Sequence, residues 1–275
     1  MEYKVLFLGR HGEGWHNVAE SYYGTPAWNC YWAEKNGNGT AHWHDATLTK
    51  AGEAQALKAH DFWQSQMTTQ RIHTPDAYFV SPLTRTLQTA NLTFTGLPLS
   101  KNSAPFTPLI KEQFREGISI HTCDHRRNRT YIHNLFPAWP IEAGFSEEDT
   151  LWNGVTAETS SAQDARSAQA LGDVFFSSSK QGSSKESKQK AFISVTSHSG
   201  EISSILRVLR HRTFSLNTGA VIPVLVRAEK KNEDVPTSSA AWTVSPHCTA
   251  PPVSSAEACV CSSATPFTTP LVTGA

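Results

Sequence analysis

Two histidines and two arginines follow short apolar runs of this sequence, where they could bind and attack an anionic group. Arg10 and His11 come directly after the run YKVLFLG, and His198 follows the run AFISVT. Arg85 lies in the segment SPLTRTLQTA, which follows the run DAYFV. The planar guanidinium of arginine forms paired hydrogen bonds with phosphate oxygens, and a neutral imidazole can act as a nucleophile. These side-chain types therefore suit the binding and transfer of a phosphoryl group.

The apolar runs before these residues predict short buried strands, and helical segments alternate with them. This alternation is typical of an α/β sandwich with a largely parallel sheet, whose ligands bind at the carboxyl ends of the strands. Gly12 would let the backbone approach a ligand closely. Ser199 and Gly200 begin the helix after His198, and the free N–H groups of a helix start favour an anion. The candidate residues would thus meet at one edge of the sheet.

The apolar pattern also gives the expected bounds of the elements. Strands are expected at 3–9, 76–80, 105–110, 191–196 and 220–227, and helices at 49–70, 159–178 and 202–209. Thr49 and Ser81 are expected to cap helices, with Pro82 in a first turn. The buried face of the helix 49–70 is expected at Ala51, Ala54, Leu57, Phe62 and Met67. Pro223 inside the last strand indicates a sheet edge or a bulge.

Four segments lack clear periodicity. Residues 22–47 are predicted to form a long aromatic-rich loop that covers a site or shapes an apolar pocket. Residues 117–157 are predicted to form an irregular cap. Residues 177–190 predict an exposed Ser/Lys loop. Residues 229–275 predict a loosely structured Ser/Thr/Pro-rich tail, which leaves residues 1–228 as the catalytic domain.

Composition excludes several functional classes. The 275 residues contain 24 Lys+Arg and 24 Asp+Glu, so no basic excess indicates a nucleic-acid or membrane partner. The start MEYKVLFLGRHG does not resemble a signal peptide, and no apolar run reaches the length of a membrane span. We expect a soluble, cytoplasmic protein. Its five cysteines, an odd number, are expected to be free thiols, with the CxC pair near the C-terminus incidental.

Four motifs resemble those of the histidine phosphatase superfamily, in its phosphoglycerate-mutase-like branch. RHGEG, SPLTRTLQTA and SHSGE occur in the family order and spacing. The segment KEQFREGISIHTCDHRRNR is similar to the one that carries the acid in plant and fungal phosphoglycerate-mutase-like proteins. The resemblance covers roughly residues 3–228 and implies a three-layer α/β/α sandwich.

The resemblance also implies roles for individual residues. His11 would be the nucleophile that becomes a phosphohistidine, while Arg10, Arg85 and His198 would hold the phosphoryl oxygens. Asn17 matches a family position that contacts phosphate through its amide, although a local helix cap is an alternative. No metal or other cofactor is expected, because the arginines supply the positive charge.

The general acid of such a reaction is expected at Glu116, which aligns with the family's acid. Burial and bound phosphate should raise its pKa so that it holds a proton near neutrality. Glu112 lies four residues earlier and is the alternative. The segment His121–His125 also suggests zinc, but its spacing suits a structural zinc site poorly. Arg126 and Arg127 are expected at the border of the substrate pocket or in a solvated turn.

The predicted function is hydrolysis of a small organic phosphate monoester or diphosphate. A mutase is the first alternative, although the Tyr-Gly segment and basic insertion of the mutase branch do not follow Glu116. His198-Ser199 and Glu13-Gly14 also depart from the acid phosphatase branch. A repurposed or non-catalytic protein of the same fold is the remaining alternative. The aromatic segment 22–47 weakly favours a substrate with an apolar or ring portion, and the sequence does not indicate the oligomeric state.

Overall fold

The central sheet of the computed structural model has five strands. The structure describes residues 2–98, 106–176, 190–229, 242–245, 247–252 and 261. The strands lie in the order β3 (Leu109–Ile110), β2 (Ala77–Val80), β5 (Phe192–Ser197), β1 (Glu2–Arg10) and β6 (Val221–Ala228). The first four are parallel to their neighbours, and β6 is antiparallel to β1. The predicted largely parallel sheet is confirmed, and Pro223 lies in an edge strand as expected.

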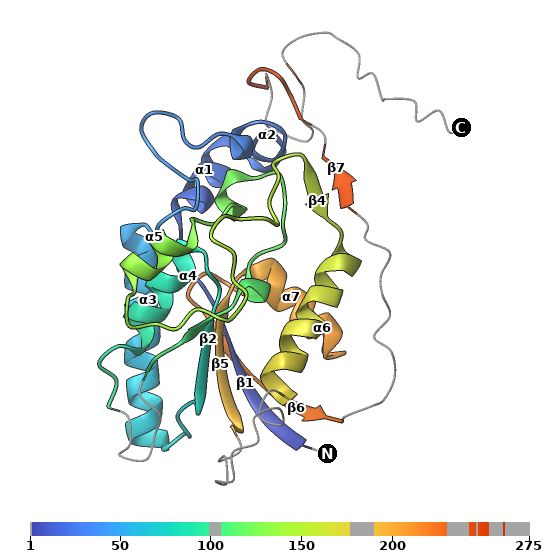
Figure 1. The fold of residues 1–275 in the computed structure, drawn as a ribbon. Helices are drawn as coiled ribbons and strands as arrows, with labels where there is room; N and C mark the ends of the chain where they lie inside the picture. The colour runs from blue at the N-terminus through green and yellow to red at the C-terminus, as the bar shows by residue number, and fades with distance from the viewer. Residues whose placement is uncertain are drawn as a thin grey trace.

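Helices cover both faces of this sheet and make it the middle of three layers. Helices α3 (Lys50–Ser65) and α4 (Thr84–Phe94) lie on one face, and α6 (Ser160–Phe176) and α7 (Ser199–Val208) lie on the other (Figure 1). The main apolar core joins α6 and α7 to the inner strands through buried Leu, Ile, Val and Phe side chains. A three-layer α/β/α sandwich is therefore confirmed.

Helix α3 begins where the sequence predicted, but its buried face differs. Thr49 Oγ1 accepts a hydrogen bond from the N–H of Gly52 at 3.0 Å, which confirms the cap. The buried residues of α3 are Gly52, Ala56, Ala59 and Trp63, whereas four of the five predicted positions are exposed and Met67 is half-buried. Gly52 is buried because its backbone touches that of the loop after β1, where an added Cβ would overlap the carbonyl oxygen of Glu13. The helix ends in a π-helical turn, η2 (Gln66–Gln70).

The segments without periodicity contain short helices over the carboxyl ends of the strands (Figure 1). The predicted loop 22–47 follows α1 (Trp15–Tyr23) and holds α2 (Thr25–Cys30) and the 3-10 turn η1 (Trp32–Glu34). Trp28 and Trp43 are buried against each other there. The expected cap 117–157 holds η4 (Thr122–Asp124) and α5 (Arg129–Leu135) and follows η3 (Glu112–Phe114). The Ser/Lys loop lies outside the described residues, except for Lys190.

Buried ion pairs hold the segment after β3 together, and an apolar cluster packs it against β2 and α4. Arg115 is fully buried and binds both oxygens of Asp149, at 2.8 and 2.6 Å. Arg126 is 1% exposed, donates to Glu112 and to several backbone carbonyls, and stacks on Phe145. The expectation of a solvated turn was therefore wrong for Arg126, and its place at the border of a substrate pocket stays a prediction. Removing one partner of such a buried pair is strongly destabilising, so these residues fix the segment in place.

The region after residue 229 is more ordered than the sequence suggested, wherever the structure describes it. Strand β7 (Trp242–Val244) pairs antiparallel with β4 (Thr156–Glu158). Cys248 is buried and its N–H donates to the carbonyl of Cys30 at 2.7 Å. Cys248 and Cys261 form a disulfide, and Cys30 is also disulfide-bonded. The expectation of free thiols was wrong at these positions, because residues distant in sequence meet there; Cys123 is a free, buried thiol. No described helix has the length and apolar character needed to cross a bilayer.

Candidate active site

His11 lies directly after β1 with its ring held in one orientation. It is 2% exposed, and its backbone N–H donates to the carbonyl of Ser197 at the end of β5. Its Nδ1 lies 2.7 Å from the carbonyl oxygen of Gly12. A carbonyl can only accept, so Nδ1 carries the proton and the lone pair of the neutral ring is on Nε2. Burial, followed by the charge of Arg85, holds the pKa of His11 well below 6.5, which keeps the ring neutral.

The loop that carries His11 is packed tightly against neighbouring backbone. A Cβ at Gly12 would overlap the carbonyl of Gly52 at the start of α3. The N–H of Gly12 donates to Thr89 Oγ1 at 2.9 Å, and Thr89 in turn donates to the carbonyl of Arg85. Glycine is required here by close approach, and the contact links the loop after β1 to both helices on this face.

His198 stands beside His11 at the end of β5. The two ring centroids are 5.1 Å apart, and His198 is fully buried. Its Nε2 lies 2.7 Å from the hydroxyl oxygen of Ser81, while its Nδ1 has no partner among the described residues. Burial, with the charges of Arg85 and His11, lowers its pKa well below 6.5. An unpartnered buried nitrogen beside His11 suits a contact to a bound oxygen.

The two arginines reach the site from different elements. Arg85, on the first turn of α4, is 1% exposed and donates from Nη1 to the carbonyl of Cys123 at 2.6 Å. Its Nη2 lies 3.3 Å from Asp124 Oδ1, and its Nε has no partner in the described chain. Arg10, at the end of β1, donates from Nη1 to the carbonyl of Leu216 at 2.6 Å. Both guanidinium groups are thus oriented by protein oxygens and keep other N–H groups for an anion.

Helix α4 is capped by a residue that the sequence pattern did not indicate. The buried carboxylate of Asp45 accepts from the N–H of Thr84 at 2.9 Å and from its hydroxyl at 2.6 Å. Ser81, the predicted cap, bonds His198 instead. A carboxylate at a helix start binds its free N–H groups and opposes the positive end of the dipole. Asp45 therefore fixes the turn that carries Arg85.

The carboxyl group of Glu116 lies at the start of α7. It accepts from the N–H groups of Gly117, Gly200 and Glu201, at 2.9, 3.1 and 2.9 Å. Burial, and then the charge of Asp124, raises its pKa, against the lowering effect of these backbone bonds. Arg10 and Arg85 lie close enough for their charges and that of Glu116 to act on one another. A buried carboxyl with a raised pKa next to an anion pocket can hold a proton for a leaving group.

A buried ion-pair network supports the backbone around Glu116. Arg166 of α6 donates to the carbonyls of Gln113, Arg115 and Glu116, and binds Glu158 at 2.8 Å. Arg166 also lies 3.2 Å from Glu201 Oε2. Burial raises the pKa of Glu201 to about 7, although Arg166 opposes that rise. Nothing in the local sequence pattern indicated this network, because Arg166 is 50 residues from Glu116 along the chain.

The alternative acid has a different environment. Glu112 forms ion pairs with Arg115 at 2.9 Å and with Arg126 at 2.8 Å. Both partners belong to the buried set that anchors the segment after β3. These contacts give Glu112 a structural position, and the geometry favours Glu116 as the proton donor.

Three predicted phosphate contacts have structural partners already. Asn17 Oδ1 accepts from the N–H of Gly14 at 3.0 Å, which is the local cap considered as an alternative; its amide N–H₂ is not used in that bond. The N–H of Gly200 donates to Glu116. The hydroxyl of Ser199 lies 3.4 Å from that of Ser215. Phosphate contacts of Asn17, Ser199 and Gly200 therefore stay predictions, and the start of α7 interacts with the acid.

The segment that suggested zinc brings three potential ligand atoms together. Those of His121, Cys123 and Asp124 lie within 4.8 Å of one another. Asp124, however, interacts with Arg85 and accepts from Ser119 Oγ at 2.7 Å. A guanidinium beside the cluster opposes a second cation. The ring of His125 is stacked on Trp152. The cluster fits a role in orienting Arg85 better than a metal site.

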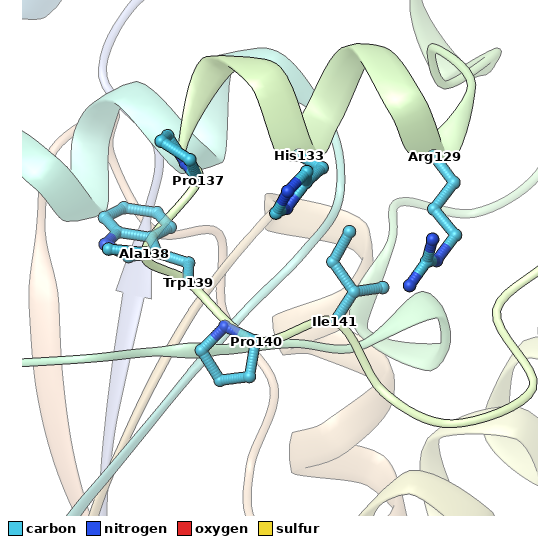
Figure 2. A pocket seen from close by; sticks show the side chains of 7 residues that line it. All are labelled: Arg129, His133, Pro137, Ala138, Trp139, Pro140 and Ile141. Carbon is cyan, nitrogen blue, oxygen red and sulfur yellow. The ribbon is translucent and has the colours of Figure 1, made fainter.

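A separate hollow lies outside this site. Seven residues of the segment around α5 line a cavity of about 320 Å³: Arg129, His133, Pro137, Ala138, Trp139, Pro140 and Ile141 (Figure 2). It shares no residue with the cluster around His11. Its polar side chains, Arg129 and His133, are exposed.

Gly200→Ala tests whether the position of Glu116 matters. An added methyl group would overlap Glu116 Oε1, so we expect the carboxyl group to move. For the hydrolysis of alkyl phosphates proposed below, kcat should then fall by about 10²-fold. Steady-state phosphate release measures this. Gly172→Ala on α6 is the matched control, because its methyl group would meet nothing within 4 Å. An unchanged kcat in Gly200→Ala would show that the chemistry does not depend on this contact.

Comparison with known proteins agrees with the motifs. The profile of the histidine phosphatase superfamily (branch 1) matches residues 6–218. The chain is 46% identical over 233 residues to a "Probable phosphoglycerate mutase" of Arthroderma benhamiae, a match that covers 85% of this chain and 66% of that protein. It is 41% identical to "Phosphomutase-like protein 3" of Candida albicans over 91% of this chain and 74% of the relative.

Solved structures of the same kind are more distant. A phosphoglycerate mutase from Thermus thermophilus is 18% identical with a TM-score of 0.39, covering 82% of this chain and 99% of that one. A mycobacterial glucosyl-3-phosphoglycerate phosphatase is 14% identical with a TM-score of 0.44, covering 82% and 91%. The family match spans most of the residues that build the sheet and its polar edge. This chain belongs to the histidine phosphatase superfamily, branch 1.

Proposed function

We propose that this protein is a phosphatase that hydrolyses a small organic phosphate monoester or diphosphate through a phosphohistidine on His11. The observation that supports this most is the fixed tautomer of His11, which leaves Nε2 free on a ring that lies beside His198 and within reach of the charges of Arg10 and Arg85. The side chain of Glu116 lies within electrostatic reach of both arginines. Nucleophile, anion clamp and proton donor thus occur together at one sheet edge.

In the first step, the lone pair of His11 Nε2 attacks phosphorus and the bond from phosphorus to the ester oxygen breaks. Glu116 gives its proton to that oxygen, so the alcohol leaves neutral and the acid becomes a carboxylate. The carbonyl of Gly12 holds Nδ1–H and stabilises the positive charge that the ring acquires. Arg10, Arg85 and His198 hold the phosphoryl oxygens and stabilise the charge on them in the transition state.

In the second step, water attacks the phosphohistidine and the bond between nitrogen and phosphorus breaks. Glu116, now a carboxylate, takes a proton from this water, and inorganic phosphate leaves. The enzyme returns to neutral His11 and protonated Glu116. One carboxyl group serves both steps, because it loses its proton in the first step and gains a proton in the second.

The aromatic segment gives little information on the leaving group. Trp28 and Trp43 are 2% and 0% exposed and pack in a core of their own with Ala19, Ala33 and Ala46. They support the cover over the sheet edge and expose almost no ring surface to a substrate, so these two residues do not favour a ring-containing substrate.

A mutase is the second candidate, because the Arthroderma relative is named as one. The two functions differ in the acceptor of the second step, which is water in a phosphatase and a hydroxyl group of a sugar acid in a mutase. The site residues above serve either acceptor.

The deciding experiment measures two products with the purified chain. Phosphate release is followed for a panel of phosphomonoesters and diphosphates, with and without EDTA. In parallel, interconversion of phosphoglycerate isomers is followed by NMR. Release that EDTA does not reduce, without isomer interconversion, is the expected result. Isomer interconversion that exceeds phosphate release would establish the mutase, and absence of both would overturn the proposal.

A further inference from the structure

His16, in the first turn of α1, is a buried histidine to which the motifs assign no role. It is 9% exposed, and its ring centroid lies 5.3 Å from that of His11. The distance from His11 to His198 is nearly the same, 5.1 Å. His11 therefore has one imidazole neighbour from the end of β5 and a second one from α1.

The imidazole of His16 is buried without a hydrogen bond to any residue that the structure describes. Its Nδ1 is buried without a hydrogen-bond partner in the part of the chain that the structure describes. That nitrogen faces the backbone of Gly14, where an added Cβ would stand 2.7 Å from it. No hydrogen bond joins Nε2 to a described residue either. A histidine buried only for stability would normally have a partner, so the missing partner of His16 calls for an explanation, and a bound ligand is one.

The charges around His16 are those of the phosphoryl clamp. Burial lowers its pKa most, and the charges of Arg85, His11 and Arg10 lower it further, followed by that of His121. Its ring therefore lies among the groups that would surround a bound phosphoryl group. His121 is a further neighbour, and its ring packs near Trp28.

We propose that His16 is a phosphate-binding residue, whose Nε2 contacts the group held by Arg10 and Arg85. Nε2 is the contacting atom because Nδ1 faces Gly14. This inference rests on the proposed function, since it assumes that the pocket binds a phosphoryl group. A phosphate dianion beside the ring favours the protonated imidazole, so phosphate binding and proton uptake at His16 should be coupled.

Binding of inorganic phosphate tests the contact without requiring turnover. Calorimetry with wild type, His16→Leu and the control His133→Leu gives the dissociation constants. Leucine has no hydrogen-bond donor. Loss of a hydrogen bond to a charged group weakens binding by about tenfold or more, and we expect this for His16→Leu. His133 is exposed on α5, so its substitution should leave the affinity unchanged. Thermal unfolding of each variant confirms that it is folded.

Imidazole NMR of the wild type supplies a readout that a structural role would not change. The signal of His16, identified by its absence in His16→Leu, is titrated with and without inorganic phosphate. We expect phosphate to raise the pKa of His16. If wild type binds phosphate, but His16→Leu binds it equally and the pKa of His16 stays the same, the inference is wrong while the proposed function stands. If wild type neither binds phosphate nor releases it from any substrate, the proposed function fails as well.

Discussion

Replacing His11 with alanine is expected to reduce phosphate release by about 10⁴-fold or more. The substitution removes the nucleophile and leaves only the binding groups, and loss of a covalent nucleophile in other hydrolases has effects of at least this size. The clamp of Arg10 and Arg85 has its own protein partners, so the variant should still fold and bind phosphate. Steady-state release from the best substrate of the panel measures the loss.

Labelling of the enzyme separates a lost nucleophile from a disturbed fold. Wild type incubated with phosphorus-labelled substrate and quenched in alkali, which preserves the nitrogen–phosphorus bond, should retain label. His11→Ala should retain none, and His133→Ala, on the exposed face of α5, should label like wild type. Full activity of His11→Ala, or label at another residue, would show that the reaction does not proceed through His11.

The parts of this fold that the sequence predicted are those with local signals. Continuous apolar runs without a helical period predicted β1, β2 and β5. The polar residues at the ends of these strands come directly after the apolar runs in the sequence. His11, Arg85 and His198 meet because parallel strands bring their carboxyl ends to one edge. The same logic found Thr49 as a cap, since its partner is only three residues away.

The parts that could not be predicted depend on partners far along the chain. Asp45 caps α4 across 39 residues, which displaced Ser81 from that role. The buried face of α3 is set by Gly52, whose contact is the loop after β1 and not the apolar stripe of the helix. The basic residues around Arg126 predicted a solvated turn. Its side chain instead donates to the backbone carbonyls of residues 127 and 146–148. Buried polar contacts of this kind leave no periodic pattern in the sequence from which they could be predicted.

Glu116→Gln is expected to reduce kcat for an alkyl phosphate by about 10²–10⁴-fold, the usual contribution of a general acid. The amide keeps the shape of the side chain, and its oxygen can still accept from the N–H groups of Gly117 and Glu201, which both bond Oε1 of Glu116. The transferable proton is lost, together with the acceptor for the N–H of Gly200. An aryl phosphate with a strongly acidic leaving group needs no proton, so its first step should be nearly unaffected.

The second step gives the variant a distinctive time course. Without a carboxylate at position 116, no base takes the proton of the attacking water. With the activated aryl phosphate, Glu116→Gln should release about one equivalent of phenolate per enzyme and then turn over slowly, with phosphohistidine accumulating. Rapid-quench measurement detects the burst. Glu112→Gln is the matched comparison, because Glu112 pairs with Arg115 and Arg126. A dependence on the leaving group in Glu112→Gln, and none in Glu116→Gln, would reverse the assignment.

The pH profile of kcat/KM for the alkyl phosphate follows from the same two groups. Activity needs neutral His11 and protonated Glu116. The pKa of His11 is lowered by burial and then by Arg85, so the acidic limb should lie well below 6.5. The pKa of Glu116 is raised above 4.5 by burial and then by Asp124. Activity should therefore be lost as the pH rises through this raised pKa. In Glu116→Gln that alkaline limb should vanish while the acidic limb stays, since an amide does not titrate and His11 is unchanged; an alkaline limb that persists would assign it to another group.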